Sequence, residues 1–144
     1  MAGEKGNTFI NDFLNLIFNA TAITNVAENA ASSPLTSLYV SLHTADPAAA
    51  GNQTTSETAY TSYARVAVAR TSGGWTVSGQ SVVPAAAITF PGCTGATSTI
   101  THFAIGTASS GAGKLLYAGP VTPNISVSTG VTPQITTATT ITEA

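Results

Sequence analysis

Hydrophobic and polar side chains alternate along most of the chain, with the period of two residues that is typical of β-strands. The first clear run covers residues 38–44 and is bounded by polar connections on both sides. A pleat in this run separates an apolar face from a wetter one, with Leu38, Val40 and Leu42 opposite Tyr39, Ser41 and His43. The pattern predicts a strand with one buried face and one half-exposed face.

A second alternating stretch, residues 60–78, contains the only Trp and both Arg of the chain. Residues 64–70 alternate, Thr71-Ser72-Gly73-Gly74 has the composition of a turn, and alternation resumes at Trp75. We therefore predict a β-hairpin formed by residues 64–70 and 75–78. Trp75 is expected in or beside the core, because a buried indole ring contributes a large apolar area.

Further alternation over residues 85–90, 97–105 and 114–118, again from Ile125, and in the tail 131–142 predicts about eight strands at short spacing. No repeat of 20 to 50 residues is present, which excludes a solenoid or a propeller. The predicted fold class is all-β, a β-sandwich of jelly-roll type with antiparallel strands. Its predicted core is Leu38, Val40, Leu42, Val66, Val68, Trp75, Val77, Ile88, Phe90, Phe103, Ile105, Leu115 and Tyr117.

One helix is predicted before the strands, over residues 8–19, with Asn7 or Thr8 as its cap. Apolar side chains recur there at spacings of three and four and include three of the five Phe residues. Two roles are open for it: a cover on one end of the sandwich, or a surface that docks on a neighbouring subunit. The domain prediction is a single domain over residues 1–144, with a mobile arm at 1–7 and the sandwich at 35–144.

Charge is scarce, since only 7% of the residues are charged, whereas about 25% is usual. The chain has 39 Ser and Thr residues, which cover a surface with hydroxyls and leave little repulsion between copies. This composition favours a component of an assembly. Four basic residues are too few to neutralise a run of phosphates, so no nucleic-acid partner is expected. Residues 9–18 are too short and too polar to cross a membrane, and no membrane partner is expected.

Groups able to perform chemistry are few and scattered. His43 lies three residues before Asp46 and His102 stands alone, so both histidines are expected to be structural and half exposed on a sheet face. Cys93 is expected to be a buried or half-buried thiol in a Gly-rich turn. Residues 106–114 lack the lysine spacing of a phosphate-binding loop and are expected to connect two strands. We predict no enzyme activity, no catalytic residues, no cofactor and no metal site.

Two segments are longer or more apolar than a sandwich requires, and we predict that they contact partners. The first is the N-terminal arm and helix, residues 5–18, and the second is the connection at 45–60, because long connections in compact domains are usually functional. The side chains predicted to contact partners are Phe9, Phe13, Ile17, Asp46, Asn52 and Tyr60.

Three stretches together resemble small virion proteins of tailed phages: SLYVSLHTADPAAAGNQTTSETAYTSYARVAVARTSGGWTVSG at 37–79, ITFP at 88–91 and THFAIGTASSGAGKLLYAG at 101–119. The proteins concerned are jelly-roll capsid cement or decoration proteins and proteins labelled tail-fibre-like. The resemblance implies a virion structural protein that is made in the host cytoplasm and lies on the outer capsid surface. Its implied partners are the major capsid protein and other copies of itself, as a homodimer or homotrimer. The alternative is a tail-fibre or receptor-binding module that binds glycans.

Overall fold

The fold is all-β with one N-terminal helix, as predicted from the sequence. A computed structural model describes residues 5–23, 26–27, 33–47 and 50–143, so residues 1–4 of the predicted mobile arm lie outside the described residues. The described chain contains one helix and nine strands in three sheets, each with antiparallel pairing. It divides into two compact units, one formed by Met1–Thr36, Ala69–Ala87 and Thr136–Ala144, the other by Ser37–Val68 and Ile88–Ile135.

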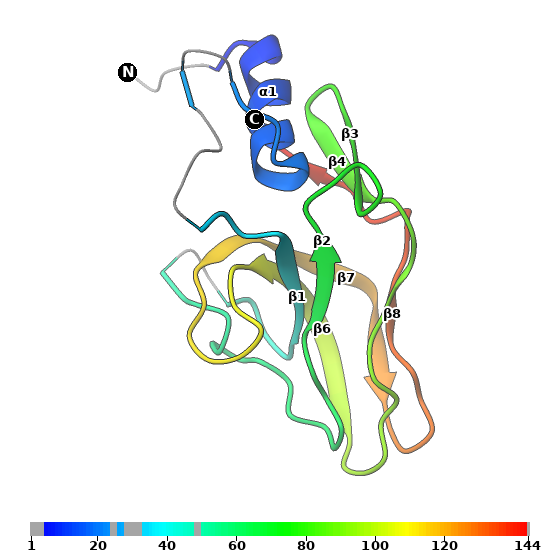
Figure 1. Cartoon of the computed structure of the whole chain (residues 1–144). Helices are drawn as coiled ribbons and strands as arrows, with labels where there is room; N and C mark the ends of the chain where they lie inside the picture. Colours follow the sequence, from blue (N-terminus) through cyan, green and yellow to red (C-terminus); the bar gives the residue numbers. More distant parts are fainter. Residues whose placement is uncertain (1–4, 24–25, 28–32, 48–49, 144) are drawn as a thin grey trace. The chain divides into compact units, whose positions relative to one another are not determined.

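Unit 1 combines the helix with a small sheet (Figure 1). Helix α1 spans Asn7–Asn19, and the three-stranded antiparallel sheet has the order β3-β4-β9. These strands are β3 at Trp75–Ser78, β4 at Ser81–Pro84 and β9 at Ile141–Thr142. Phe18 of α1 meets Trp75 edge-on at 4.9 Å between ring centroids, so the helix and the sheet share one small aromatic core.

Helix α1 begins and ends at residues that suit its termini. Gly6, not Asn7 or Thr8, is the N-cap, and its carbonyl accepts from the Ile10 amide. At the other end Ala20 has φ 53°, and its amide caps the Asn15 carbonyl. The side chains spaced four apart, Ile10, Leu14 and Phe18, are buried.

The hairpin predicted for residues 64–78 is wrong in its pairing. β2, Val66–Ala69, belongs to the sheet of β1, whereas β3 pairs with β4 in the register Trp75↔Pro84. The β3–β4 connection is only Gly79 and Gln80, and Gly79 has the positive φ, 58°, that a two-residue hairpin favours. The turn at 71–74 exists, but it joins strands of two different sheets. The hairpin is therefore formed at the two-residue turn Gly79-Gln80 and not at the four-residue turn 71–74.

Unit 2 is built on a four-stranded sheet of order β2-β1-β6-β7. β1 spans Ser37–His43, β6 spans Ser98–Gly106 and β7 spans Leu115–Val127. Two short strands pair separately, β5 at Ile88–Thr89 with β8 at Gln134–Ile135. The predicted strands at 114–118 and from Ile125 are thus one long strand, while the predicted strand at 85–90 is reduced to two residues.

The strand β6 does not keep one alternation throughout. Its register with β7 shifts between Ile100 and His102, where two residues on β6 correspond to five on β7. The extra residues lie on β7, so the irregularity bends β7 and leaves the pairing of β6 with β1 continuous. Ile100 and Phe103, three positions apart on β6, are both buried, and so are Ala104 and Ile105, so the last part of β6 is covered on both faces.

Edge strands explain which predicted core residues are not fully buried. The confirmed members are Leu38, Val40, Leu42, Trp75, Ile88, Phe90, Phe103 and Ile105. The prediction was wrong for five residues that are only half-buried: Val66, Val68, Val77, Leu115 and Tyr117. All five lie on β2, β3 or β7, which stand at sheet edges. An edge strand has a neighbour on one side only, so its side chains are covered less completely.

Candidate functional site

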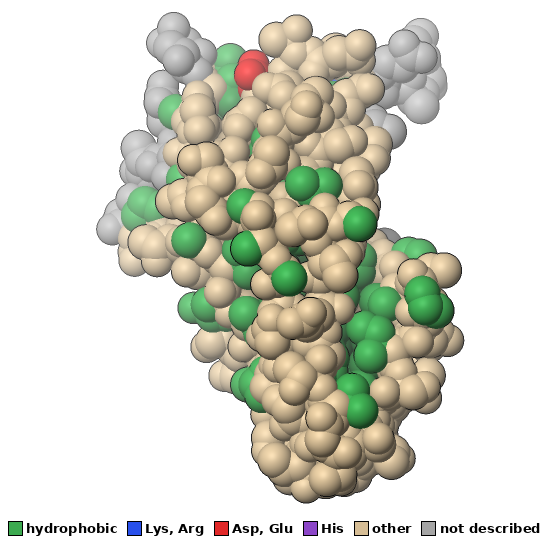
Figure 2. Space-filling model, turned by 90° about the vertical axis from the view of Figure 1, so that its right-hand side faces the viewer, with side chains coloured by type: hydrophobic (Ala, Val, Ile, Leu, Met, Phe, Trp, Pro, Cys, Tyr) green, Lys and Arg blue, Asp and Glu red, His purple; other side chains and the backbone are tan. Residues whose placement is uncertain are grey.

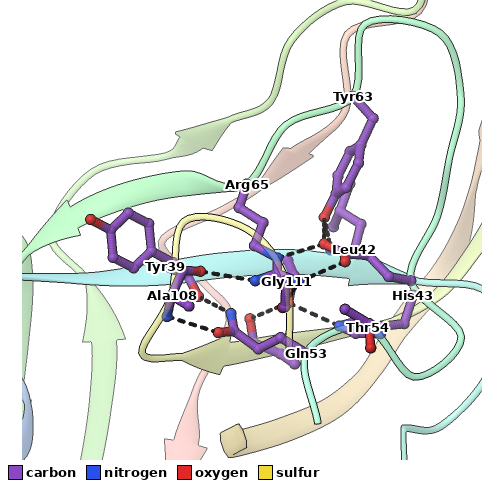
Figure 3. A network of polar contacts seen from close by, with 12 residues as sticks. Tyr39, Leu42, His43, Gln53, Thr54, Tyr63, Arg65, Ala108 and Gly111 are labelled. Carbon is purple, nitrogen blue, oxygen red and sulfur yellow. Dashed lines mark hydrogen bonds and ion pairs between the residues drawn. The ribbon is translucent and has the colours of Figure 1, made fainter. Parts of the chain in front are cut away.

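A network of buried polar contacts follows β1 from Tyr39 to His43 (Figure 3). It joins β1, the connection at 45–63 and the 107–114 loop between β6 and β7. The described part of the 45–60 connection, which omits residues 48–49, is therefore fixed to the sheet and is not an open flap.

Arg65 is the centre of this network. Its side chain is only 2% exposed, and it forms two 2.7 Å contacts to Glu57, from Nε to Oε1 and from Nη2 to Oε2. The same guanidinium donates to the Ala108 carbonyl at 2.9 Å and to the Gly111 carbonyl at 2.8 Å. The hydrogen bonds to Glu57 raise the pKa of Arg65. One cation thus holds two separate loops.

Gln53 is the second link, and it is fully buried. Its amide donates to the Tyr39 carbonyl at 3.1 Å and its Oε1 accepts from the Ala108 amide at 3.0 Å. Glycine is required beside it, because a Cβ at Gly106 would lie 2.2 Å from Gln53 Cδ and one at Gly113 would lie 2.1 Å from Oε1. The Gly-rich segment 106–114 is a connection between strands, as predicted, and its glycines admit this side chain.

Tyr63 completes the contacts around Glu57. Its hydroxyl donates to Glu57 Oε1 at 2.9 Å and accepts from the Leu42 amide at 3.0 Å. Burial raises the pKa of Tyr63, so the phenol stays protonated and remains a donor. Its ring stacks on Phe90 with centroids 6.4 Å apart, which connects the polar network to the apolar core.

His43 is fully buried, and the prediction that it is half exposed was wrong. Its Nδ1 lies 2.9 Å from the Thr55 carbonyl and its Nε2 lies 2.9 Å from Ser41 Oγ. Because a carbonyl only accepts, Nδ1 carries the proton and Nε2 accepts from the serine hydroxyl. Burial lowers the pKa of His43 and keeps it neutral. Both ring nitrogens of His43 are thus held by Thr55 and Ser41, and His102 is half-buried on β6, as predicted.

The Ser41 and His43 pair has the separation of a nucleophile and its base, yet the two side chains are both 0% exposed. The group behind the imidazole is a neutral carbonyl, which orients the ring and favours its charged form, but burial outweighs this effect and lowers the pKa of His43. This arrangement anchors the 45–63 connection to β1. Among the described residues no three His, Cys, Asp or Glu side chains converge as metal ligands do.

The residues predicted to contact partners occupy different environments. Phe9 is 43% exposed, Phe13 and Ile17 are half-buried on α1, and Asp46 is exposed. Asn52 is half-buried, and its Oδ1 accepts from the Thr54 amide within its own turn. Tyr60 is 3% exposed, its hydroxyl donates to the Pro91 carbonyl, and burial raises its pKa to about 12. Tyr60 therefore belongs to the interior of unit 2.

A row of asparagines on α1 is a feature of unit 1 whose contacts the sequence analysis did not predict. The amide of Asn15 donates to Oδ1 of Asn11, and the amide of Asn19 donates to Oδ1 of Asn15. Asn11 and Asn7 then join the β3–β4 turn, through the Gly79 carbonyl and the Gln80 amide. These asparagines recur every four residues in the sequence, which places them on one face of the helix.

Arg70 holds the other end of the helix. Its guanidinium donates to the carbonyls of Leu16, Ile17 and Leu35 at 2.7, 2.8 and 2.7 Å. The last carbonyls of a helix have no partner within it and carry partial negative charge, so a cation there is favourable. Burial lowers the pKa of Arg70. Each of the two arginines thus organises one unit.

Cys93 is a buried free thiol, as predicted, and its Sγ contacts the Gly95 carbonyl at 3.1 Å.

Within the described residues, no helix has the length and apolar character needed to cross a bilayer.

Comparison with known proteins gives one match that covers nearly the whole chain. No curated protein matches it. A family model described as podophage GP4 fiber I protein gp80 matches residues 6–142, which include α1 and every strand of both units. The chain therefore belongs to the podophage GP4 fiber I protein gp80 family and is a phage structural protein of the fiber-like kind.

Proposed function

We propose that this chain is a structural subunit of a phage tail fibre and that it acts through assembly rather than catalysis. The observation that carries the proposal is the family match over residues 6–142, whose description names a fiber protein. The match extends across both units, so the comparison concerns the whole described fold. Nothing in the comparison names a capsid protein, and the outer-capsid location expected from the sequence stays a prediction.

The surface of the chain supports a role in assembly. On the face drawn in Figure 2 almost no side chains are coloured as charged, and hydrophobic groups lie singly or in small patches among uncharged side chains and backbone. The chain has four basic and six acidic residues in 144. Surfaces with so little charge repel one another weakly, which suits subunits packed in many copies. The same scarcity of basic groups argues against a nucleic-acid partner.

The buried network supports a structural role for the groups that most resemble catalytic ones. Ser41 and His43 contact each other but neither reaches solvent, and Glu57 is paired with Arg65. We propose that these residues hold loops and perform no reaction. A hydrolase activity of the purified chain that disappears in Ser41→Ala would contradict this part of the proposal.

We place the partner contacts mainly on α1. Phe9, Phe13 and Ile17 keep exposed or half-exposed apolar surface, whereas Tyr60 is committed to the interior and Asn52 to its own turn. Asp46, which is exposed, stays a candidate contact from the 45–60 connection. The proposed partners are copies of the same chain and neighbouring fibre proteins. The major capsid protein is the partner only if the capsid alternative is correct.

The proposal is tested by separating heads from tails of purified virions and counting peptides of this chain in each fraction. A fibre subunit is expected in the tail fraction, in no more than a few dozen copies per particle, because a fibre occupies few symmetry-related positions. Hundreds of copies in the head fraction would overturn the fibre proposal and support a capsid cement protein. Binding of the isolated chain to a glycan array would add receptor recognition to the fibre role.

A further inference from the structure

Helix α1 has a wider apolar surface than its own unit covers. At about 100° per residue, its apolar positions extend over roughly 200° of the helix circumference. A helix that packs on a single core needs an apolar stripe of about 100°. The positions that form this wide surface are Phe9, Ile10, Phe13, Leu14, Leu16, Ile17 and Phe18.

Burial divides this surface into two stripes. Ile10, Leu14 and Phe18 are fully buried and form the stripe that packs in unit 1. The second stripe, which we call the Phe ridge, consists of Phe9, Phe13 and Ile17. Phe9 is 43% exposed and the other two are half-buried, and the rings of Phe9 and Phe13 lie 6.4 Å apart. The Phe ridge is therefore an ordered apolar surface that its own unit leaves uncovered in part.

The other sides of the helix are already committed. The asparagine row on one side binds the β3–β4 turn through Asn7 and Asn11. The C-terminal end is held by Arg70, whose third carbonyl partner is Leu35, a residue that is itself 41% exposed. Since these contacts fix how α1 is rotated, the Phe ridge cannot turn inward without breaking them.

The chemistry of the Phe ridge points to a second copy as its occupant. Its side chains are spaced four residues apart, and ridges with this spacing interdigitate with identical ridges when two helices cross at about −50°. The ridge carries no charge, and the charged side chain of α1, Asp12, lies on another side of the helix. A charged partner would find no complement there, whereas a copy of the same ridge would meet no repulsion. A two-fold contact between identical patches satisfies both conditions.

We propose that the Phe ridge joins two copies of this chain through α1. The proposal names the partner of the α1 contact and so rests on the proposed function. The two are tested separately, because oligomeric state is measured on the purified chain whereas fibre location is measured on virions. Light scattering coupled to size-exclusion chromatography should give a dimer for the wild type. Phe9→Ser should give a monomer with an unchanged circular dichroism spectrum, because Phe9 is the most exposed ridge residue and contributes least to the core.

Single cysteines provide an independent readout, because the native Cys93 is buried and should not cross-link. Leu16→Cys, three residues after Phe13 and beside the ridge on the same helix, should form a disulfide-linked dimer under mild oxidation. The matched control is Thr8→Cys, an exposed position on the far side of the same helix, which should stay unlinked. A monomeric wild type, or an oligomer that Phe9→Ser leaves intact, would overturn the proposal. If the purified chain is a monomer and its peptides are nevertheless found in the tail fraction of virions, the contact between copies is wrong and the proposed fibre function stands.

Discussion

The two arginines stand five residues apart in sequence and organise the two units in different ways. Arg65 is paired with a carboxylate and two carbonyls in unit 2, and its pKa is raised by that pairing. Arg70 binds three main-chain carbonyls in unit 1, and burial lowers its pKa. A full ionic partner compensates a buried cation better than carbonyl dipoles do.

The two units differ in how completely their polar groups are paired and their apolar side chains are covered within the unit. In unit 2 even the long connection is tied to the sheet by buried polar contacts. In unit 1 the helix keeps an uncovered apolar stripe, and Phe9, Val26 and Leu35 are exposed. We interpret unit 2 as a rigid scaffold and unit 1 as the part that makes contacts.

Loss of Arg65 should have the largest effect. Arg65→Ala leaves the Glu57 carboxylate and two carbonyls without their donor, and breaking a buried ion pair on one side costs about 3 kcal/mol. Denaturant unfolding measures this loss, and hydrogen exchange should show faster exchange in the 107–114 loop. Arg65→Lys is the control that keeps the charge without the planar fork, and it should recover only part of the stability. A loss below about 1 kcal/mol would mean that the network is peripheral.

Crowding Gln53 should cost less than removing Arg65. Gly106→Ala places a Cβ 2.2 Å from a buried, hydrogen-bonded side chain, so a loss of about 1–3 kcal/mol is expected. Gly73→Ala is the matched control, because the nearest atom to its Cβ would be 3.6 Å away. The double variant Gly106→Ala with Gln53→Ala should lose less stability than the sum of the losses measured for the two single variants. Strict additivity would show that Gln53 does not fill the space at Gly106.

Loss of the Arg70 side chain should destabilise the protein less than loss of Arg65, and the effect should be confined to unit 1. Arg70→Ala deletes hydrogen bonds to Leu16, Ile17 and Leu35, and charge-assisted bonds contribute about 2 kcal/mol in such cases. Amides of α1 should exchange faster while those of β1 and β6 stay protected. If the 107–114 loop also lost protection, the assignment of one arginine to each unit would be wrong.

The smallest effect is a pH dependence from His43. The folded pKa lies below the ordinary value of 6.5, so the stabilising contribution is complete above that pH. As the pH falls below 6.5, the unfolded state takes up a proton that the folded state resists, and stability decreases. The slope is at most about 1.4 kcal/mol per pH unit. Unfolding of the wild type and of His43→Gln should be compared at about pH 7 and pH 5; identical pH dependence would contradict a buried neutral imidazole.

The sequence predicted elements more reliably than their pairing. Alternation located β1 and β6, and the apolar spacing located α1, because these patterns follow directly from the geometry of strands and helices. Pairing depends on competition between turns, and the two residues Gly79 and Gln80 formed a hairpin where a longer turn at 71–74 was expected. Local alternation carries no information about that competition.

The polar network could not be predicted for a related reason. Glu57, Arg65 and Gln53 are polar residues in loops, and sequence gives no sign that a loop side chain will be buried. Apart from the Glu57–Arg65 pair and the Tyr63 hydroxyl, their partners are main-chain carbonyls and amides, which are the same at every position. The available signal was the presence of only two arginines, because a guanidinium has five donors and can bind several groups at once.

The claim that unit 1 makes the contacts is tested most directly by hydroxyl-radical footprinting of the chain in virions and as purified Phe9→Ser monomer. In virions Phe13 and Ile17 should be oxidised much more slowly than in the monomer, while Tyr39 and Tyr117 of unit 2, half-buried in the single chain, should react at similar rates in both. Equal oxidation of Phe13 in the two samples, with protection of unit 2 instead, would contradict the account.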